Sequence, residues 1–190
     1  MRVFVTGASG WIGSAVVPEL VSAGHAVTGL ARSDASAERI RTAGATPVPG
    51  SLDDLESIRS GAAAADAVIH LGFKHDFSDY AGAGRTERAV VATIGDELAG
   101  SDRPFLFASG IVARPGELLT EDVASPYVGA DAPRGGGEAF AFEYADRGVR
   151  PVALRFSPTV HGRGDHGFST ELVRVAREKG VAGYVGDGSN

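Results

Sequence analysis

The sequence contains no cysteine, a single tryptophan and a single methionine among its 190 residues. Without cysteine the chain forms no disulfide and offers no thiolate as a nucleophile or metal ligand. No apolar run approaches the length of a transmembrane helix, and the first residues read as a core strand instead of a signal peptide. We therefore expect a cytoplasmic protein without a membrane partner.

Positive charge is also scarce, because 18 Lys and Arg residues face 24 Asp and Glu residues for a net charge of −6. Broad nucleic-acid binding relies on clustered basic residues that neutralise phosphates, so we expect no nucleic-acid partner. Any site for an anionic ligand therefore has to be formed by a few neighbouring groups and not by an extended basic surface. Glycine, in contrast, is abundant at 27 residues, and 43% of the chain is hydrophobic, which suits one globular domain with many tight turns.

The most specific motif lies at the start of the chain. Residues 3–13, VFVTGASGWIG, run from an apolar strand through the spacing G-x-x-G-x-x-G into an amphipathic helix. Gly7 permits the turn, Gly10 lets a pyrophosphate approach the backbone, and Gly13 lets the helix pack closely on the sheet. The motif predicts a dinucleotide site formed by Gly7, Ser9, Gly10, Trp11, Ile12 and Gly13. The alternative is a glycine turn with a purely structural role.

Apolar strand-like runs alternate with helical stretches along the chain, which is typical of βαβ units and a parallel sheet. We expect strands at residues 2–6, 26–31, 46–48, 67–71, 104–109 and 151–156. We expect helices at residues 13–23, 35–43, 52–60, 86–99, 136–147 and 169–179. Ligands bind such sheets at the carboxyl ends of the strands.

The stretch TGASGWIG resembles the fingerprint of the extended and atypical short-chain dehydrogenase/reductases, the NAD(P)-dependent epimerase/dehydratase group. The segments at 67–72 (AVIHLG), 105–110 (FLFASG) and 154–162 (LRFSPTVHG) resemble further landmarks of that family in the expected order. The resemblance implies an α/β fold with a Rossmann-type, doubly wound parallel sheet over residues 1–160. It also implies cofactor contacts from Leu71, Gly72, Pro158 and Val160.

The resemblance further implies that residues 161–190 begin a substrate-binding lobe, since family members continue beyond a similar Gly-Asp-Gly with more strands and helices. We therefore expect an incomplete C-terminal substrate lobe. A cofactor half-site would survive that loss. A closed pocket for a small-molecule substrate would need another chain, such as a second copy in a homo-oligomer, to supply the missing wall.

The residues after the second expected strand indicate which nicotinamide cofactor binds. NAD-specific family members usually place an acidic residue there, whereas Arg32 and Ser33 would bond and neutralise a 2′-phosphate. This favours NADP(H) over NAD(H). The alternative is an ordinary surface arginine followed by Asp34 as a helix N-cap. Ser51 and Leu52 stand where the family commonly has Asp-Leu or Asp-Val beside the adenine, a substitution that weakens this contact.

The Tyr-x-x-x-Lys helix of the family is missing. If Glu138 corresponds to the glutamate four residues after the family lysine, Arg134 takes the lysine position and Ala130 the tyrosine position. Arg134 could contact ribose or phosphate, but an arginine stays protonated and does not shuttle protons. The family asparagine is absent too, with Glu87 near its place, whereas His70 inside an apolar strand reads as structural.

The remaining catalytic candidates are Ser109, which would bond a substrate carbonyl, and the loop histidines His75, His161 and His166, which could donate a proton near neutral pH. Alternatively, Ser109 closes a strand and the histidines make ordinary hydrogen bonds. The three histidines and Asp165 lack the spacing of a metal site, so we predict no metal.

These observations predict an NADP(H)-binding oxidoreductase of the atypical short-chain type that transfers hydride to or from a small carbonyl or alcohol substrate. The missing tyrosine and lysine leave open a second hypothesis, in which the protein is a non-catalytic NADP(H)-binding sensor or scaffold. A sugar-nucleotide epimerase or dehydratase is a third reading, although no paired carboxylates nominate its acid and base.

Overall fold

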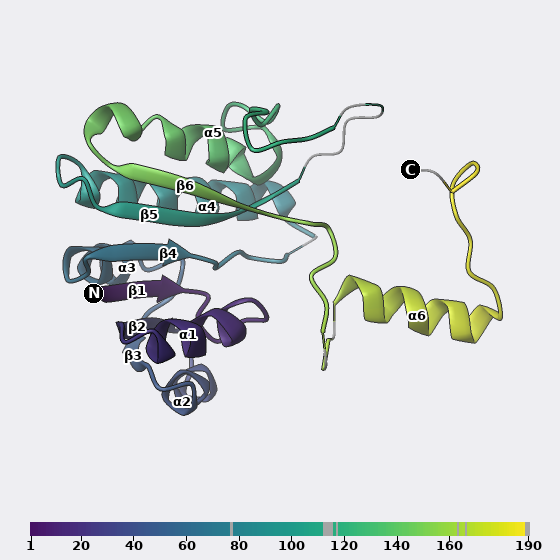
Figure 1. Ribbon diagram of the computed structural model, residues 1–190, viewed down its shortest axis with the longest axis horizontal. Helices are drawn as coiled ribbons and strands as arrows, with labels where there is room; N and C mark the ends of the chain where they lie inside the picture. The colour runs from purple at the N-terminus through teal and green to yellow at the C-terminus, as the bar shows by residue number, and fades with distance from the viewer. Residues whose placement is uncertain (77, 112–115, 117, 163, 166, 189–190) are drawn as a thin grey trace.

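The computed structural model describes residues 1–76, 78–111, 116, 118–162, 164–165 and 167–188. Its centre is a six-stranded sheet in the order β3-β2-β1-β4-β5-β6, in which every pair of neighbours is parallel (Figure 1). The strands are β1 (Arg2–Thr6), β2 (Ala26–Ala31), β3 (Thr46–Pro49), β4 (Ala67–His70), β5 (Pro104–Gly110) and β6 (Arg150–Phe156). The strand order reverses between β1 and β4, where doubly wound sheets open their ligand crevice.

The helices are α1 (Gly13–Ser22), α2 (Asp34–Thr42), α3 (Leu55–Ala63), α4 (Tyr80–Leu98), α5 (Gly137–Phe142) and α6 (Phe168–Lys179). Two short 3₁₀ turns, η1 (Pro133–Gly136) and η2 (Ala145–Arg147), flank α5. The predicted α/β, doubly wound parallel fold is confirmed. Every strand boundary expected from the sequence agrees with the structure to within one residue.

The observed first residues of the helices differ more from the expected ones than the strand boundaries do. Side-chain caps explain the differences at α3 and α4. The α3 helix begins at Leu55 instead of Leu52 because the Asp54 carboxylate accepts a hydrogen bond from the Ser57 N–H. The α4 helix begins at Tyr80, six residues before the expected start, because Asp79 caps it through the Gly82 N–H. The expected helix at 136–147 is shorter as well, since it ends at Phe142 and passes into η2.

Alternate strand residues pack on opposite faces of the sheet and build two core layers. Phe4 lies between the sheet and the helices α3, α4 and α5, whereas its neighbour Val5 lies on the face covered by α1 and α2. The first layer includes Ile58, Ile94, Leu98, Phe105 and Phe107. The second includes Val17, Val27, Ile40 and Ile69. The carboxyl ends of the strands therefore rest on a scaffold packed from both sides.

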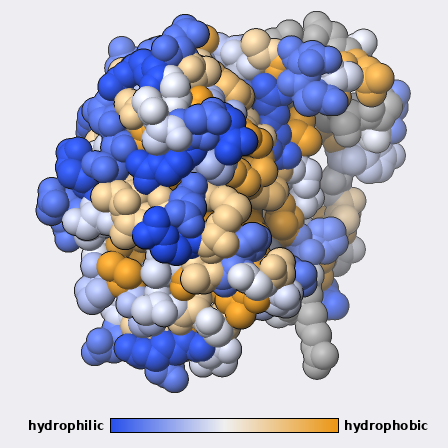
Figure 2. Space-filling model, turned by 60° about the vertical axis from the view of Figure 1, so that its left-hand side comes forward, coloured by the Kyte–Doolittle hydropathy of each residue, from blue (hydrophilic) through white to orange (hydrophobic). Residues whose placement is uncertain are grey.

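The α6 helix stands away from this sandwich at the end of the chain (Figure 1). None of its residues is buried, and Phe168 and Leu172 are 62% and 53% exposed. Hydrophobic residues also reach the surface elsewhere, between hydrophilic regions (Figure 2). No helix among the described residues has the length and apolar character needed to cross a membrane.

Candidate functional site

The glycines after β1 form a turn whose backbone leaves no room for side chains at two positions. Gly7 has a φ of 67°, and a Cβ on it would lie 2.6 Å from the Gly72 nitrogen. A Cβ on Gly13 would lie 2.2 Å from the Gly7 carbonyl oxygen. Gly10 differs, because a Cβ there would meet only that carbonyl oxygen, at 3.1 Å, and would otherwise face open space. Gly10 is therefore the position where a ligand can approach the backbone.

The start of α1 can supply donors for such a ligand at Ile12 and Gly13, because the next two N–H groups, of Ser14 and Ala15, already donate to the Gly10 and Ile12 carbonyl oxygens. Ile12 occupies the N-cap position, no side chain caps the helix, and its first turn contains no acidic residue. The N–H groups at an uncapped helix start carry partial positive charge and bind phosphate. The turn therefore fits the pyrophosphate of a dinucleotide, with room at Gly10 and donors at the start of the helix.

Residues from other strand ends converge on this turn. The Leu71 N–H donates to the Thr6 carbonyl oxygen at 3.1 Å, and the Gly72 N–H donates to the Thr6 hydroxyl at 3.3 Å. A Cβ on Gly72 would lie 3.1 Å from the Leu52 side chain, so the segment after β3 reaches the same place. Ser51, next to Leu52, accepts the Asp53 N–H and shapes that turn.

The loop after β6 returns to the glycine turn as well. The indole Nε1 of Trp11 donates to the Val160 carbonyl oxygen at 2.7 Å. Pro158 lies in the same exposed loop, which the Ser157 hydroxyl braces through the Thr159 carbonyl oxygen. The structure thus brings together predicted cofactor residues that follow β1, β3, β4 and β6.

Arg32 and Ser33 lie at the carboxyl end of β2. Arg32 is exposed and has no ion pair or hydrogen bond within the described ranges. Ser33 caps α2, since its hydroxyl accepts the Ser36 N–H at 3.2 Å. The alternative in which Asp34 caps this helix is therefore wrong, because Asp34 is the first helical residue and Ser33 already makes the capping bond.

Arg134 lies beside the end of β4. Its Nη2 donates to Glu87 at 3.2 Å, and its guanidinium carbon lies 4.3 Å from the centre of the Phe73 ring. The backbone of Arg134 is left-handed, with φ 56° and ψ 28°. Its side chain is 30% exposed, so part of it reaches solvent.

A buried polar chain stands behind Arg134. The Thr6 hydroxyl lies 2.5 Å from His70 Nδ1, and His70 Nε2 lies 3.2 Å from the Glu87 carboxylate. The side chains of His70 and Glu87 are only 1% and 4% exposed. Burial raises the pKa of the Glu87 carboxyl, but its interactions with His70 and Arg134 outweigh this effect and hold the pKa below its ordinary value. Sequence reasoning missed this contact, although polar residues inside apolar segments were its visible signal.

Ser109 belongs to a different cluster. Its hydroxyl donates to Glu138 Oε2, and the other carboxylate oxygen of Glu138 accepts from Arg155 at 2.5 Å. A serine hydroxyl has one proton, so in this arrangement Ser109 does not offer it to a carbonyl substrate. The next residue, Gly110, has no side chain to replace it.

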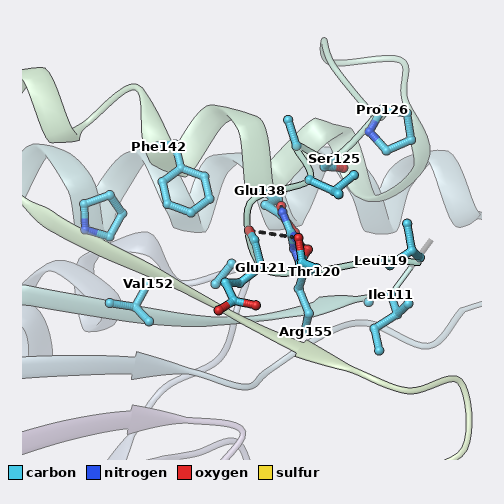
Figure 3. A pocket seen from close by; sticks show the side chains of 15 residues that line it. Ile111, Leu119, Thr120, Glu121, Ser125, Pro126, Glu138, Phe142, Val152 and Arg155 are labelled. Atoms are coloured by element: carbon cyan, nitrogen blue, oxygen red, sulfur yellow. Dashed lines mark hydrogen bonds and ion pairs between the residues drawn. The ribbon is translucent and has the colours of Figure 1, made fainter. Parts of the chain in front are cut away.

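A cavity of about 540 Å³ lies beside this cluster, at the β6 edge of the sheet. Figure 3 shows the Glu138 and Arg155 side chains meeting in its wall, with Phe142 and Val152 nearby and Ile111 toward the other end. None of the predicted cofactor residues lines it. This cavity and the glycine turn are therefore separate features of the molecule.

The two described candidate histidines, His75 and His161, have different neighbours. The His75 ring meets the Phe73 ring edge-on at 5.3 Å, next to Arg134. His161 is exposed and lines a second cavity, of about 490 Å³, together with residues of α6. His166 lies outside the described residues. Within the described ranges, no group of three His, Asp or Glu side chains is arranged to hold a metal ion.

Comparisons with known proteins agree with this geometry. Residues 7–127 match the family model described as NAD(P)H-binding. An uncharacterized protein of Schizosaccharomyces pombe is 45% identical over 194 residues, covering 100% of this chain and 64% of its own length. The 2-alkyl-3-oxoalkanoate reductase of Stenotrophomonas maltophilia is 31% identical over 207 residues, covering 100% of this chain and 60% of its own length.

Among solved structures, MoeE5 in complex with UDP-glucose and NAD superposes with a TM-score of 0.71 at 24% identity, covering 100% of this chain and 65% of that one. This likeness concerns the fold. The chain spans less than two thirds of the length of the curated relatives that it matches. From the match over residues 7–127 and the glycine turn, the chain belongs to the NAD(P)H-binding protein family, and its resemblance to the short-chain dehydrogenase/reductase and epimerase/dehydratase group is confirmed.

Proposed function

We propose that the protein is an NADPH-dependent reductase that transfers hydride to a small carbonyl compound, or takes it back from the alcohol. The observation that carries this proposal is the uncapped start of α1 beside the open position at Gly10. Arg32, at the end of β2, has no side-chain partner among the described residues. A free guanidinium there matches the 2′-phosphate that distinguishes NADP(H) from NAD(H).

We assign residues 1–160 to cofactor binding and residues 161–190 to the beginning of the substrate side. The Trp11–Val160 bond supports this division, because it places the loop after β6 against the glycine turn. The exposed apolar residues of α6, Phe168 and Leu172 among them, suit a segment that packs against further protein or against substrate.

The bound cofactor supplies the hydride, and the protein has to supply a proton for the alkoxide that forms. Ser109 already donates its proton to Glu138, which favours a histidine as the donor. His75 is our first choice because its ring contacts Phe73, directly after the predicted cofactor contacts Leu71 and Gly72. His161 is the second choice, since it follows the Val160 loop.

The 3-oxoalkanoate reductase among the relatives supports a ketone or aldehyde substrate, since it aligns over 100% of this chain. A panel of ketones, aldehydes and 3-oxo acids would test the reaction by following NADPH consumption with the full-length gene product. We expect slow turnover that falls as a histidine deprotonates, and a much lower rate in His75→Gln. Consumption of NADPH equal to that of a blank on every substrate would contradict the reductase.

The Ser109→Ala variant distinguishes a serine that bonds the substrate carbonyl from one that only bonds Glu138. If Ser109 bonds the substrate carbonyl, the variant loses turnover while its NADPH affinity stays unchanged. If the hydroxyl only braces Glu138, turnover of the folded variant stays close to that of the wild type. A surface variant such as Ser22→Ala controls for the loss of a hydroxyl, because Ser22 bonds only within its own helix.

A second candidate is a non-catalytic NADPH-binding sensor. Its support is specific, since Ala130 and Arg134 replace the catalytic pair and the Ser109 proton is engaged by Glu138. Tight NADPH binding without turnover on any member of the panel would favour this candidate. The sugar-nucleotide epimerase has no comparable support, because the neighbour bound to UDP-glucose is similar in fold alone.

A further inference from the structure

The backbone at Arg134 departs from what its residue type prefers. Arg134, Gly135 and Gly136 form a run of left-handed residues, with φ values of 56°, 62° and 60°. A Cβ on Gly135 would lie 2.4 Å from the Gly84 carbonyl oxygen, and one on Gly136 would lie 2.6 Å from the Gly129 carbonyl oxygen. Glycine is required at those two positions and is conformationally favoured at the third. Residue 134 is therefore an arginine at a position whose left-handed backbone favours glycine.

Glu87 is the partner that holds this side chain. Each oxygen of its buried carboxylate has its own partner, Oε1 accepting from Arg134 at 3.2 Å and Oε2 lying 3.2 Å from His70 Nε2. A buried carboxylate is stable only when it is paired in this way, so its orientation and that of Arg134 depend on each other.

His70 connects Glu87 to the glycine turn. The His70 Nδ1 faces the Thr6 hydroxyl and its Nε2 faces the Glu87 carboxylate. The same Thr6 hydroxyl accepts the Gly72 N–H, and Thr6 directly precedes Gly7. A continuous hydrogen-bonded chain therefore runs from the cofactor turn, through the interior, to Arg134.

The outer face of Arg134 remains available to a ligand. The guanidinium stacks on Phe73, the residue after Leu71 and Gly72, and the side chain keeps 30% of its surface exposed. Its bond to Glu87 uses one N–H, whereas a guanidinium has five. Fixed donors at this place suit the hydroxyl and phosphate oxygens of a dinucleotide.

We propose that Glu87 and His70 are positioning residues that hold Arg134 against the bound nicotinamide cofactor, in place of the lysine that this chain lacks. The inference rests on the proposed function, because it requires that the glycine turn binds NADPH. Arg134 is the only member of the three that contacts the cofactor, through hydroxyl or phosphate oxygens. Glu87 and His70 act through Arg134 and stay buried.

A double-mutant cycle tests this proposal with NADPH affinity as the readout. Glu87→Gln and Arg134→Gln should each weaken NADPH binding about tenfold, the loss expected when a charge-assisted hydrogen bond disappears or loses its alignment. The double variant should bind no more weakly than Arg134→Gln alone, since Glu87 acts only through Arg134. Glu19→Gln, an exposed residue of α1, is the matched control and should bind as the wild type does.

If Glu87→Gln does not fold, variants of Arg134 and His70 still test the positioning role. Arg134→Lys retains the charge and should lose less affinity than Arg134→Gln, and both changes lie at a partly exposed side chain. His70→Gln should weaken NADPH binding less than Arg134→Gln does, because Glu87 keeps its other partner.

Different failures have different meanings. If the wild type binds NADPH and the folded Glu87→Gln and Arg134→Gln variants bind it equally well, the positioning role is wrong while the proposed function stands. Additive losses in the double variant would also overturn the positioning role. If the wild type binds neither NADPH nor NADH, the proposed function fails and this inference fails with it.

Discussion

The proposed preference for NADPH depends on Arg32, whose side chain has no ion pair or hydrogen bond within the described part of the chain. Replacing Arg32 by alanine should remove a charge-assisted contact worth roughly 1.5–3 kcal/mol from NADPH binding and leave NADH binding nearly unchanged. The measurement is a titration of wild type and variant with both cofactors. Arg41→Ala, on the exposed surface of α2, controls for the loss of a positive charge. Equal affinity of the wild type for both cofactors would refute the preference.

Gly10 tests the position of the pyrophosphate. Gly10→Val should abolish cofactor binding and leave the fold intact, because a side chain there meets only the Gly7 carbonyl oxygen, at 3.1 Å, and projects where the ligand approaches. Thermal scans with and without NADPH measure both effects. Gly183→Ala, after α6, is a control at a position with nothing within 4 Å and no left-handed backbone. A ligand shift equal to that of the wild type in Gly10→Val would mean that the phosphates bind elsewhere.

Asp66 makes stability depend on pH. Hydrogen bonds from Arg2 lower its pKa from the ordinary 3.8 to about 2. A carboxyl group whose pKa is lowered by folding stabilises the folded state at pH values above its ordinary pKa. This contribution disappears as the pH falls through the pKa of the folded state. The stability difference between wild type and Asp66→Asn should therefore be constant near neutral pH and vanish between about pH 4 and pH 2. Urea unfolding across this range measures it, and a difference that persists at pH 2 would contradict the assignment.

At the scale of secondary structure, the Glu138–Arg155 pair joins α5 to β6. Glu138 is 6% exposed and Arg155 22% exposed, and their contact raises the pKa of the arginine through its hydrogen bond to the carboxylate. Glu138→Gln should lower the free energy of unfolding by about 3 kcal/mol, because it leaves a mostly buried cation without its counter-charge. Glu143→Gln, exposed just after α5, should change it little. Equal unfolding midpoints for the two variants would show that the pair does not join these elements.

At the scale of the whole molecule, the cofactor should stabilise the fold because it binds only the native state. NADPH at one hundred times its dissociation constant should add about 2.7 kcal/mol to the free energy of unfolding. For a chain of this size that corresponds to a rise in melting temperature of roughly 5–10 °C. NADH at the same concentration should produce a smaller rise, and the Gly10→Val variant none. A larger rise with NADH would reverse the proposed preference.

Much of this fold could be predicted from local patterns. The strand boundaries follow from short apolar runs, and the glycine turn follows from backbone geometry that a few neighbouring residues dictate. Helix starts were less predictable. The glycines at 82 and 84 obscured the first turns of α4, although Gly84 is needed there because a Cβ would lie 2.8 Å from the Gly135 nitrogen. The glycine at position 84 is explained by its contact with a distant loop and not by helix propensity.

The sequence by itself determined the α/β alternation, the glycine turn and the family, because each depends on residues that lie close together in the chain. Only the tertiary structure decided which polar side chains meet. His70 finds Thr6 across 64 positions and Glu87 across 17, and Ser109 finds Glu138 across 29. Parallel strands are joined by long crossovers, so the residues that meet at one edge of the sheet are distant in sequence and no local pattern predicts their pairing.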